Sequence, residues 1–253
     1  MSYDETTTQV QFSSSLKEAL LPAEEEMYHR FLPLEEEVQQ WLDTPVGHLS
    51  QSLEPSSHLD MAIHGSALAN FINQIQLEES GADISCTSFA NTIKGFNSNV
   101  TVRDIMSTYV YPNTLAVLSV SGELLKKALE RCASYFDYKD GELCISDAFL
   151  KPKVEHYNYD YFSNIEYTFS LDKEVGQRVT SLKHQGKEIL PDDTFTLVMN
   201  NYRASGAGGY EFFCDCPVVK EILTEMPELI INYFKKYGNV TVDTNQYIQV
   251  LCQ

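Results

Sequence analysis

Tyrosines that neighbour asparagines are the residues of this sequence best suited to bind a ligand. The chain contains 15 tyrosines and one tryptophan. Tyr111 and Asn113 lie in the stretch YPN, Tyr202 follows two asparagines in NNYR, and residues 158–164 read NYDYFSN. A tyrosine ring offers a flat apolar face and an asparagine amide offers a paired donor and acceptor, so the combination suits a planar heterocycle such as a purine. The alternative is that these rings pack in the hydrophobic core.

A run of glycines after Tyr202 suggests a second kind of chemistry, the cradling of a phosphate. Three of the four residues from 206 to 209 are glycines, and glycine allows backbone conformations that other residues avoid. A P-loop would need a lysine directly after the glycines, whereas Lys220 is far along the chain. A dinucleotide-binding fingerprint would need a third glycine where Phe212 stands. The pattern by itself therefore favours an ordinary tight loop.

Neither the histidines nor the cysteines have the spacing of metal ligands or catalytic groups. The six histidines, at positions 29, 48, 58, 64, 156 and 184, form no H-E-x-x-H motif, and no serine lies in G-x-S-x-G. Cys214 and Cys216 form a C-x-C without a second pair, which is poor spacing for zinc. We expect all six cysteines to be free thiols that serve packing. We also expect no catalytic residue, metal or cofactor in this chain.

The composition is that of an acidic globular protein. Hydrophobic residues make up 43% of the chain, and 36 Asp and Glu against 18 Lys and Arg give a formal net charge of −18. Such a surface repels polyanions, so nucleic-acid polymers are not expected as partners, while a single nucleotide in a local pocket remains possible. The N-terminal residues lack the pattern of a signal peptide, and no stretch is apolar enough to span a bilayer. We expect no membrane insertion, and a cytoplasmic location if the start is native.

The elements that must position these groups alternate irregularly. Apolar residues at three- and four-residue spacing predict a helix over 15–42, interrupted at Pro22 and Pro33. The same spacing predicts a second helix over 60–79, which Gly81 would end. A buried strand is expected in ADISCTS, a loop in FANTIKGF, a strand in NTLAVLSVSG and a helix in GELLKKALERCASYF.

Strands dominate beyond Asp137, in IEYTFSL, RVTSLKHQG, TFTLVMNN and YIQVLC. Residues 217–238 are expected to form one further helical region, broken near Pro227 and ended by Gly238. Helices and strands thus mix without a regular βαβ repeat. This order favours an α+β fold over a doubly wound sheet.

Several of these stretches together resemble the C-terminal domain of the 5′-nucleotidase family. They are GADIS, FANTIKGF, VTVRDIMSTYVYPNTLAVLSVSGELLKKALE, YNYDYFSNIEYTFSLDKEVGQRVTSL and LVMNNYRASGAGGY, in the family's order from about residue 44 to residue 253. The most similar branch is the bacterial 2′,3′-cyclic-nucleotide 2′-phosphodiesterase/3′-nucleotidases. The resemblance implies a single α+β domain with a mixed sheet and flanking helices. In that family the domain binds the nucleoside, and an N-terminal metallophosphatase domain with two metal ions hydrolyses the phosphoester.

The resemblance also implies which residues bind the substrate. Tyr111 and Tyr202 match two aromatic rings that hold the base between them, and Asn113 matches an asparagine that addresses the base edge. Arg203 and Gly206 join this set through the same NNYRASG block, in which the glycines are implied to keep the loop flat against the base.

Two positions depart from the better-known members of the family. Gly208 is placed in the substrate-binding set, although an aspartate holds the ribose at the matching position of those enzymes. Lys94, in FANTIKGF, is the nearest cation where those enzymes carry phosphate-binding arginines. This second difference is typical of the cyclic-phosphodiesterase branch.

The expected organisation is a tail and inter-domain linker helix over 1–43, followed by a substrate-binding domain over 44–253. The expected partners are a nucleoside or nucleotide monomer, with an adenine-type base favoured, and the metallophosphatase domain of a parent enzyme. That absent domain would carry the divalent metal pair, so this chain alone is expected to be inactive. The parent hydrolase would serve nucleotide catabolism after export to the periplasm or cell wall. The alternatives are a non-catalytic interaction module and a paralogue that sequesters nucleotides.

Overall fold

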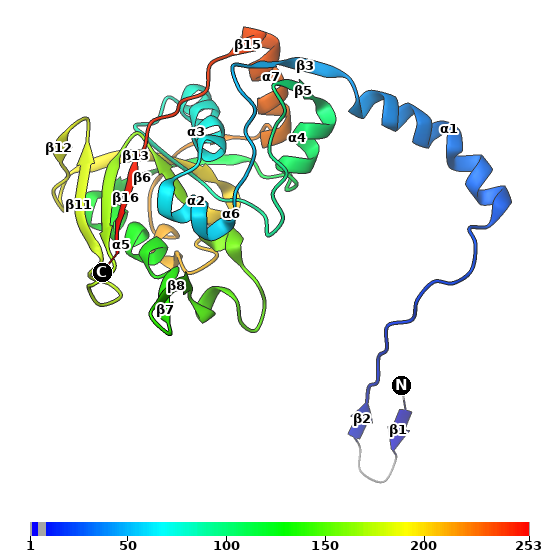
Figure 1. Ribbon diagram of the computed structural model, residues 1–253, viewed down its shortest axis with the longest axis horizontal. Helices are drawn as coiled ribbons and strands as arrows, with labels where there is room; N and C mark the ends of the chain where they lie inside the picture. Colours follow the sequence, from blue (N-terminus) through cyan, green and yellow to red (C-terminus); the bar gives the residue numbers. More distant parts are fainter. Residues whose placement is uncertain (1, 5–8, 253) are drawn as a thin grey trace. The chain divides into compact units, whose positions relative to one another are not determined.

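The structure of the protein, a computed structural model, describes residues 2–4 and 9–252 and divides into two units. From Leu42 onward the chain forms a compact α+β unit, whose elements are shown in Figure 1. The preceding unit contains an antiparallel strand pair, β1 (Ser2–Asp4) and β2 (Gln9–Gln11), and helix α1 (Glu25–Leu42).

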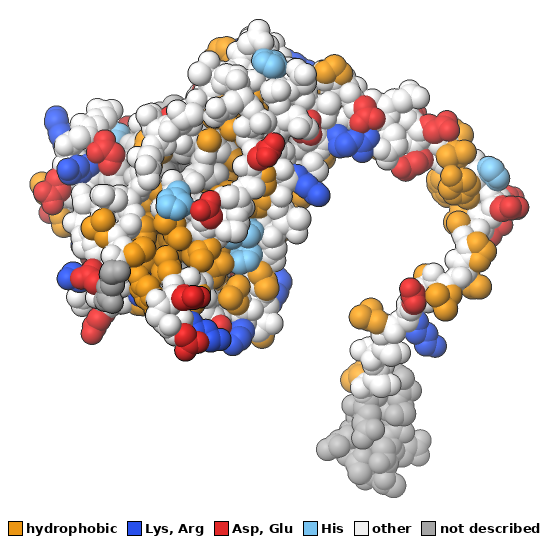
Figure 2. Space-filling view, in the orientation of Figure 1, with side chains coloured by type: hydrophobic (Ala, Val, Ile, Leu, Met, Phe, Trp, Pro, Cys, Tyr) orange, Lys and Arg blue, Asp and Glu red, His pale blue; other side chains and the backbone are white. Residues whose placement is uncertain are grey.

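Helix α1 exposes its apolar side chains. No residue of this helix is buried, and Figure 2 shows hydrophobic side chains along it. The exposed apolar residues recur at four- and three-residue spacing: Met27, Phe31, Leu34, Val38 and Trp41. The helix begins at Glu25 rather than at residue 15, and it runs through Pro33, because an interior proline removes one hydrogen bond and can bend a helix without ending it.

A mixed five-stranded sheet lies in the compact unit, with the strand order β14-β6-β13-β4-β9. Strand β13 runs parallel to β4 and antiparallel to β6, while β14 and β9 pair antiparallel at the two edges. The central strands are almost wholly buried, which accounts for their continuous apolar sequences. The bounds are β4 (Ile84–Thr87), β6 (Leu115–Ser121), β9 (Tyr161–Ser163), β13 (Thr194–Asn200) and β14 (Val218–Ile222).

A second sheet has the order β12-β11-β10-β16, and helix α5 (Gly122–Ala133) contacts both β6 of the first sheet and β11 of the second. Its strands are β10 (Glu166–Ser170), β11 (Val179–His184), β12 (Lys187–Glu188) and β16 (Ile248–Leu251). The remaining strands form a three-stranded sheet and a hairpin: β3 (Pro45–Leu49), β5 (Asn99–Thr101) and β15 (Asn239–Val240), then β7 (Phe136–Lys139) and β8 (Glu142–Ile145). The predicted α+β fold with a mixed sheet is confirmed.

Capping residues set the helix bounds and correct one prediction. The helix expected over 60–79 is two helices, α2 (His58–His64) and α3 (Ala67–Ser80), because Gly65 has a φ of 79° and the Ser66 side chain caps α3. Gly81 ends α3 in the left-handed conformation, as predicted. Helix α4 (Val102–Thr108) begins with a capping box, and α3 packs against β4 and β9.

The region after Pro217 required a second correction. Its first part is strand β14, not helix, because it pairs with β6 at the sheet edge, where Val218 and Lys220 can stay exposed. Helix α7 (Met226–Tyr237) follows, with Pro227 in its first turn, where a proline is tolerated, and Gly238 beyond its end. All six cysteines are free, as predicted. No helix in the described part of the chain is long and apolar enough to cross a membrane.

Candidate functional site

The ends of four strands lie together on one side of the five-stranded sheet, across the strand direction. Strands β4 and β13 are parallel, so both end at this edge, at Thr87 and Asn200. Strands β6 and β9 run antiparallel to them and therefore begin there. The register confirms this arrangement, since Asn200 lies opposite Leu115 and Thr87 lies opposite Tyr161. Loops from four separate parts of the chain are thereby placed side by side, and ligands commonly bind beyond the carboxyl ends of parallel strands.

A cavity of about 340 Å³ lies among these loops, and we call it the tyrosine cavity. Tyr111 reaches it from the loop before β6, and Tyr202 reaches it from the short helix α6 (Asn201–Ala204) after β13. These two rings are 45% and 41% exposed, so they are not core residues. The volume falls in the range of small-molecule sites. The lining residues are Ser88, Tyr111, Asn113, Lys153, Tyr157, Asn200 and Tyr202.

Two asparagines, Asn113 and Asn200, contribute side-chain amides to the lining of the cavity. Asn200 is 5% exposed, and its Oδ1 accepts a hydrogen bond from the Arg203 backbone N–H at 2.7 Å, which caps α6. Burial raises the pKa of Tyr109 to about 12, against the opposing effect of hydrogen bonds with the Asn113 and Asn200 side chains. The Tyr109 hydroxyl therefore stays protonated at neutral pH.

Tyr157 and Lys153 form a further wall, which the sequence analysis did not single out. Tyr157 lies in the single turn His156–Asn158 that precedes β9, and its ring meets that of Tyr202 edge to face, with 6.4 Å between centroids. The Lys153 ammonium donates a hydrogen bond to the Tyr157 hydroxyl at 2.9 Å. The wall is thus joined to one of the two predicted rings.

Arg203 does not contact the cavity, contrary to its predicted place among the substrate-binding residues. Its side chain is 1% exposed and forms a two-pronged ion pair with Asp160, with Nε–Oδ2 at 2.6 Å and Nη2–Oδ1 at 3.1 Å. Nη2 also donates to the Tyr157 carbonyl at 2.9 Å, and the guanidinium lies 4.1 Å from the centroid of the Tyr210 ring. A buried guanidinium needs such partners. Arg203 therefore joins helix α6, which carries Tyr202, to the backbone of Tyr157.

The glycines of the loop have close neighbours within the protein, and one of them packs against this arginine. Gly208 has a φ of 80°, and a Cβ placed there would collide with Asn158 Oδ1 and with Arg203 Nη1. Gly206, also at 80°, faces the Cys214 sulfur, to which a Cβ would approach within 2.5 Å. Neither glycine lines the tyrosine cavity. Gly208 is needed for close packing against the Arg203 guanidinium, and Gly206 for the close approach to Cys214. That the loop lies flat against a base stays a prediction.

The predicted residues therefore separate into two groups. Tyr111, Asn113 and Tyr202 line one cavity, whereas Arg203 and the glycines lie behind it. Lys94 is exposed and is not among the lining residues of the cavity. Sequence reasoning missed Ser88, Lys153, Tyr157 and Asn200. Tyr157 directly precedes the stretch NYDYFSN and Asn200 begins the stretch NNYR, but no motif marks Ser88 or Lys153.

A stacked pair of histidines lies behind the Tyr157 turn. The rings of His58, from α2, and His156 lie 4.0 Å apart between centroids and 19° from parallel. His156 Nδ1 is 2.6 Å from the Tyr135 hydroxyl, and His58 Nε2 is 3.0 Å from the Asn91 carbonyl. Burial and the neighbouring His58 lower the pKa of His156 to about 4. Burial also lowers the pKa of His58, although its hydrogen bond to Asn91 opposes this. Both rings are therefore neutral at pH 7.

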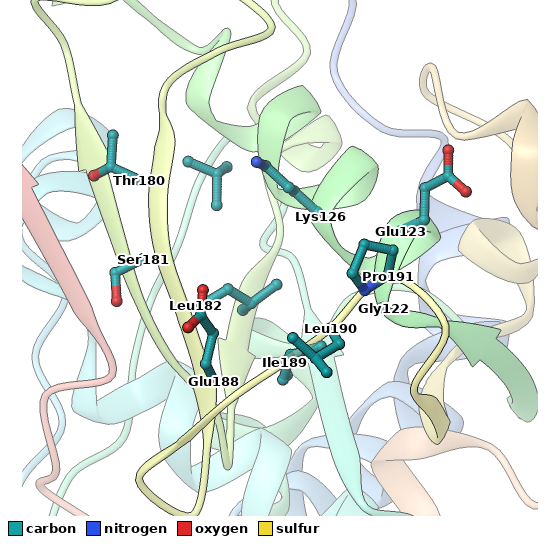
Figure 3. Close-up of a pocket in the computed structure, with 11 residues that line it drawn as sticks. Gly122, Glu123, Lys126, Thr180, Ser181, Leu182, Glu188, Ile189, Leu190 and Pro191 are labelled. Carbon is teal, nitrogen blue, oxygen red and sulfur yellow. The ribbon is translucent and has the colours of Figure 1, made fainter.

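A second cavity, of about 290 Å³, lies between the start of α5 and strands β11 and β12 (Figure 3). Lys126 extends from α5, and Thr180 and Ser181 lie on the neighbouring strand. None of the described residues that line this cavity is aromatic or carries a side-chain amide, so it offers neither a stacking face nor a base-reading edge. The tyrosine cavity offers both and is preferred to it as the candidate site. Among the described residues, no group of three or more His, Cys, Asp or Glu side chains could hold a metal ion.

The sequence matches that of a known domain family over most of the compact unit. The family is the 5′-nucleotidase, C-terminal domain, and the match covers residues 45–215. This chain belongs to that family. All the residues that line the tyrosine cavity lie within the matched region.

Relatives of this C-terminal domain are nucleotide phosphoesterases. The trifunctional nucleotide phosphoesterase protein YfkN of Bacillus subtilis is 26% identical over 161 residues, which are 58% of this chain and 11% of YfkN. The 2′,3′-cyclic-nucleotide 2′-phosphodiesterase/3′-nucleotidase of Haemophilus influenzae is 31% identical over 133 residues, 47% of this chain and 20% of that enzyme. The chain thus spans less than two thirds of these relatives.

Solved structures show the same fold. A Staphylococcus aureus protein assigned as a 5′-nucleotidase, solved in complex with α-ketoglutarate, is 34% identical and superposes with a TM-score of 0.85. The superposition covers 94% of this chain and 46% of that protein. The 5′-nucleotidase precursor of Thermus thermophilus, 19% identical, has a TM-score of 0.69 over 89% of this chain and 43% of its own length. The second similarity concerns the fold alone.

Proposed function

We propose that the tyrosine cavity binds the base of a nucleoside or nucleotide, with Tyr111 and Tyr202 on its two sides. The observation that carries this proposal is that one cavity collects both exposed rings and two asparagine side chains from two segments that are far apart in the chain. Membership of the 5′-nucleotidase C-terminal domain family and the names of the relatives support it. The compact unit would then be the substrate-binding domain of a 2′,3′-cyclic-nucleotide 2′-phosphodiesterase/3′-nucleotidase.

The residues of the cavity would act by stacking and by reading the base edge. Aromatic stacking contributes about 1–3 kcal/mol for each base and tolerates any base, because every base has a π-face. Asn113 lines the cavity and can add selectivity, since an asparagine amide can pair with an adenine edge through two hydrogen bonds. An adenine-type base is therefore the favoured ligand.

Hydrolysis itself would belong to a metallophosphatase domain outside this chain. A divalent metal pair there would activate water and stabilise the attacking and leaving oxygens. The residues described here would bind the substrate and orient it toward that domain. Because stacked rings fix the plane of the base, they also restrict where the phosphate can lie, which is the contribution of positioning to catalysis.

Calorimetric titration of the full chain with adenosine tests the base site. Tyr111→Ala and Tyr202→Ala should each weaken adenosine binding about five- to a hundredfold, because each removes one stacking face. Tyr111→Phe and Tyr202→Phe should bind almost as the parent chain does, since the ring face carries the contact. Tyr28→Ala is the matched control, because Tyr28 is 54% exposed on α1 and lies outside the compact unit. Equal binding by the two cavity variants and the control would contradict the proposal.

A further inference from the structure

Lys153 is the one formally charged residue among the described residues that line the tyrosine cavity. The chain as a whole carries a formal charge of −18, so a cation at this place opposes the general field of the protein. A neutral base between two rings needs no such charge. The lysine therefore calls for an explanation beyond stacking.

The contacts of Lys153 leave most of its ammonium group available. Its Nζ donates to the Tyr157 hydroxyl at 2.9 Å, and an ammonium has three donors. The nearby Glu155 is already engaged, because its Oε1 accepts from the Tyr157 hydroxyl at 3.1 Å and its Oε2 accepts from Asn158 Nδ2 at 3.0 Å. Tyr157 thus links lysine and carboxylate and fixes the direction of the lysine. Hydrogen bonding with Tyr157 is also the main reason why the pKa of Lys153 is raised.

Burial distinguishes the Asn200 amide from the lysine. Asn200 is 5% exposed and lies at the floor, whereas Lys153 is exposed and lies at the rim. A base whose polar edge points to the amides would leave its sugar and phosphate at the rim.

We propose that Lys153 binds the phosphate of the ligand, so that the tyrosine cavity prefers nucleotides to nucleosides. This inference rests on the proposed function, because it requires the base to lie between the two tyrosines. Lysine is well suited to the task, since its compact charge and long stem can follow a phosphate without a fixed geometry. Tyr157 is then a positioning residue that directs the ammonium toward the rim.

The test compares the affinities of adenosine and adenosine 3′-monophosphate, measured by calorimetry at low and at physiological salt. The parent chain should bind the nucleotide about three- to tenfold more tightly than the nucleoside, as expected for one partly exposed charge pair. Lys153→Met should remove this preference and leave the affinity for adenosine within about twofold. Lys153→Arg should retain it. Added salt should reduce the preference in the parent chain, because it screens the pair.

Lys151→Met is the matched control. Lys151 lies two residues away, is 72% exposed and pairs with Asp147 outside the cavity, so its loss should leave the nucleotide preference intact. Equal affinities of the parent chain for nucleotide and nucleoside would overturn the inference while leaving the base site in place. So would an equal loss of both affinities in Lys153→Met, since that would assign Lys153 to the base or to the shape of the cavity. No binding of either ligand would refute the base site itself.

Discussion

At the scale of single residues, a buried charge joins the segments that carry Tyr202 and Tyr157. Tyr202 and Arg203 are neighbours in the chain, yet one is 41% exposed and the other 1%. The buried guanidinium binds Asp160 and the Tyr157 carbonyl, so it joins the helix that carries Tyr202 to the turn that carries Tyr157. The rings are thereby held from behind, and their faces remain free for stacking.

The Asp160–Arg203 pair gives a prediction about stability. Asp160→Asn preserves shape but leaves the buried guanidinium without a counter-charge, and removing one partner of such a pair costs about 3–5 kcal/mol. Urea denaturation should show a loss of this size in the free energy of unfolding. Asp147→Asn is the control, because Asp147 is 70% exposed in its pair with Lys151, and exposed pairs contribute about 1 kcal/mol or less. Similar losses in the two variants would show that the buried pair is not a structural anchor.

At the scale of elements, the stacked histidines join helix α2 to the Tyr157 turn in a pH-dependent manner. The pKa of His156 is about 4 in the folded chain, below its ordinary value of 6.5. A group with a lowered folded pKa binds protons more readily when unfolded, so its stabilising effect is complete above pH 6.5 and declines as the pH falls toward 4. Protonation would also bring like charges together in the His58–His156 stack.

Thermal melting between pH 7 and pH 4 tests this linkage. Between pH 7 and pH 4 the melting temperature of the parent chain should fall further than that of His156→Gln, because the variant lacks the group that takes up the proton. Acidic side chains titrate in both proteins, so the difference between the two curves isolates the histidine. His64→Gln should follow the parent curve, since the His64 side chain is 67% exposed and its ion-pair partner, Asp60, lies one turn away on the same helix. Parallel curves for the parent and His156→Gln would contradict the prediction.

Local patterns in the sequence predicted those elements whose signals are themselves local. The spacing of apolar residues predicted strand β6 and helix α5. Gly81 predicted the end of α3, because glycine readily takes the left-handed conformation that ends a helix. The break between α2 and α3 was missed because a serine cap within an apolar stretch is a weak signal. Strand β14 was missed because it exists through pairing with β6, which is a long-range contact that overrides local preference.

In the candidate site, too, residues with a local sequence signal were predicted and residues placed by long-range contacts were missed. Tyr111, Asn113 and Tyr202 could be named because aromatic and amide residues stand together in their stretches and match a family pattern. Ser88 and Lys153 enter the cavity only because the register of β4 and β9 brings their loops to the same edge. The burial of Arg203 depends on Asp160, 43 positions away in the chain, so no window of sequence could have placed it behind the site.

At the scale of the whole molecule, the proposed division of labour predicts that this chain binds but does not hydrolyse. Purified protein incubated with adenosine 3′-monophosphate and Mn²⁺ should release no phosphate above a protein-free baseline, because the proposal places the metal ligands in another domain. The measurement is a phosphate-release assay over several hours at high protein concentration. Release that a chelator abolishes would contradict the division of labour, while leaving the base site open to its own test.

The meeting of four strand ends links occupancy of the cavity to the integrity of the whole fold. A ligand that touches Ser88, Tyr111, Tyr157 and Tyr202 fastens segments that are remote along the chain, as a reversible cross-link would. At a hundred times its dissociation constant, a ligand that binds only the folded state adds about 2.7 kcal/mol to stability. Libraries of metabolites can therefore be screened by melting temperature or by resistance to protease, and the natural ligand can be found without any assay of turnover.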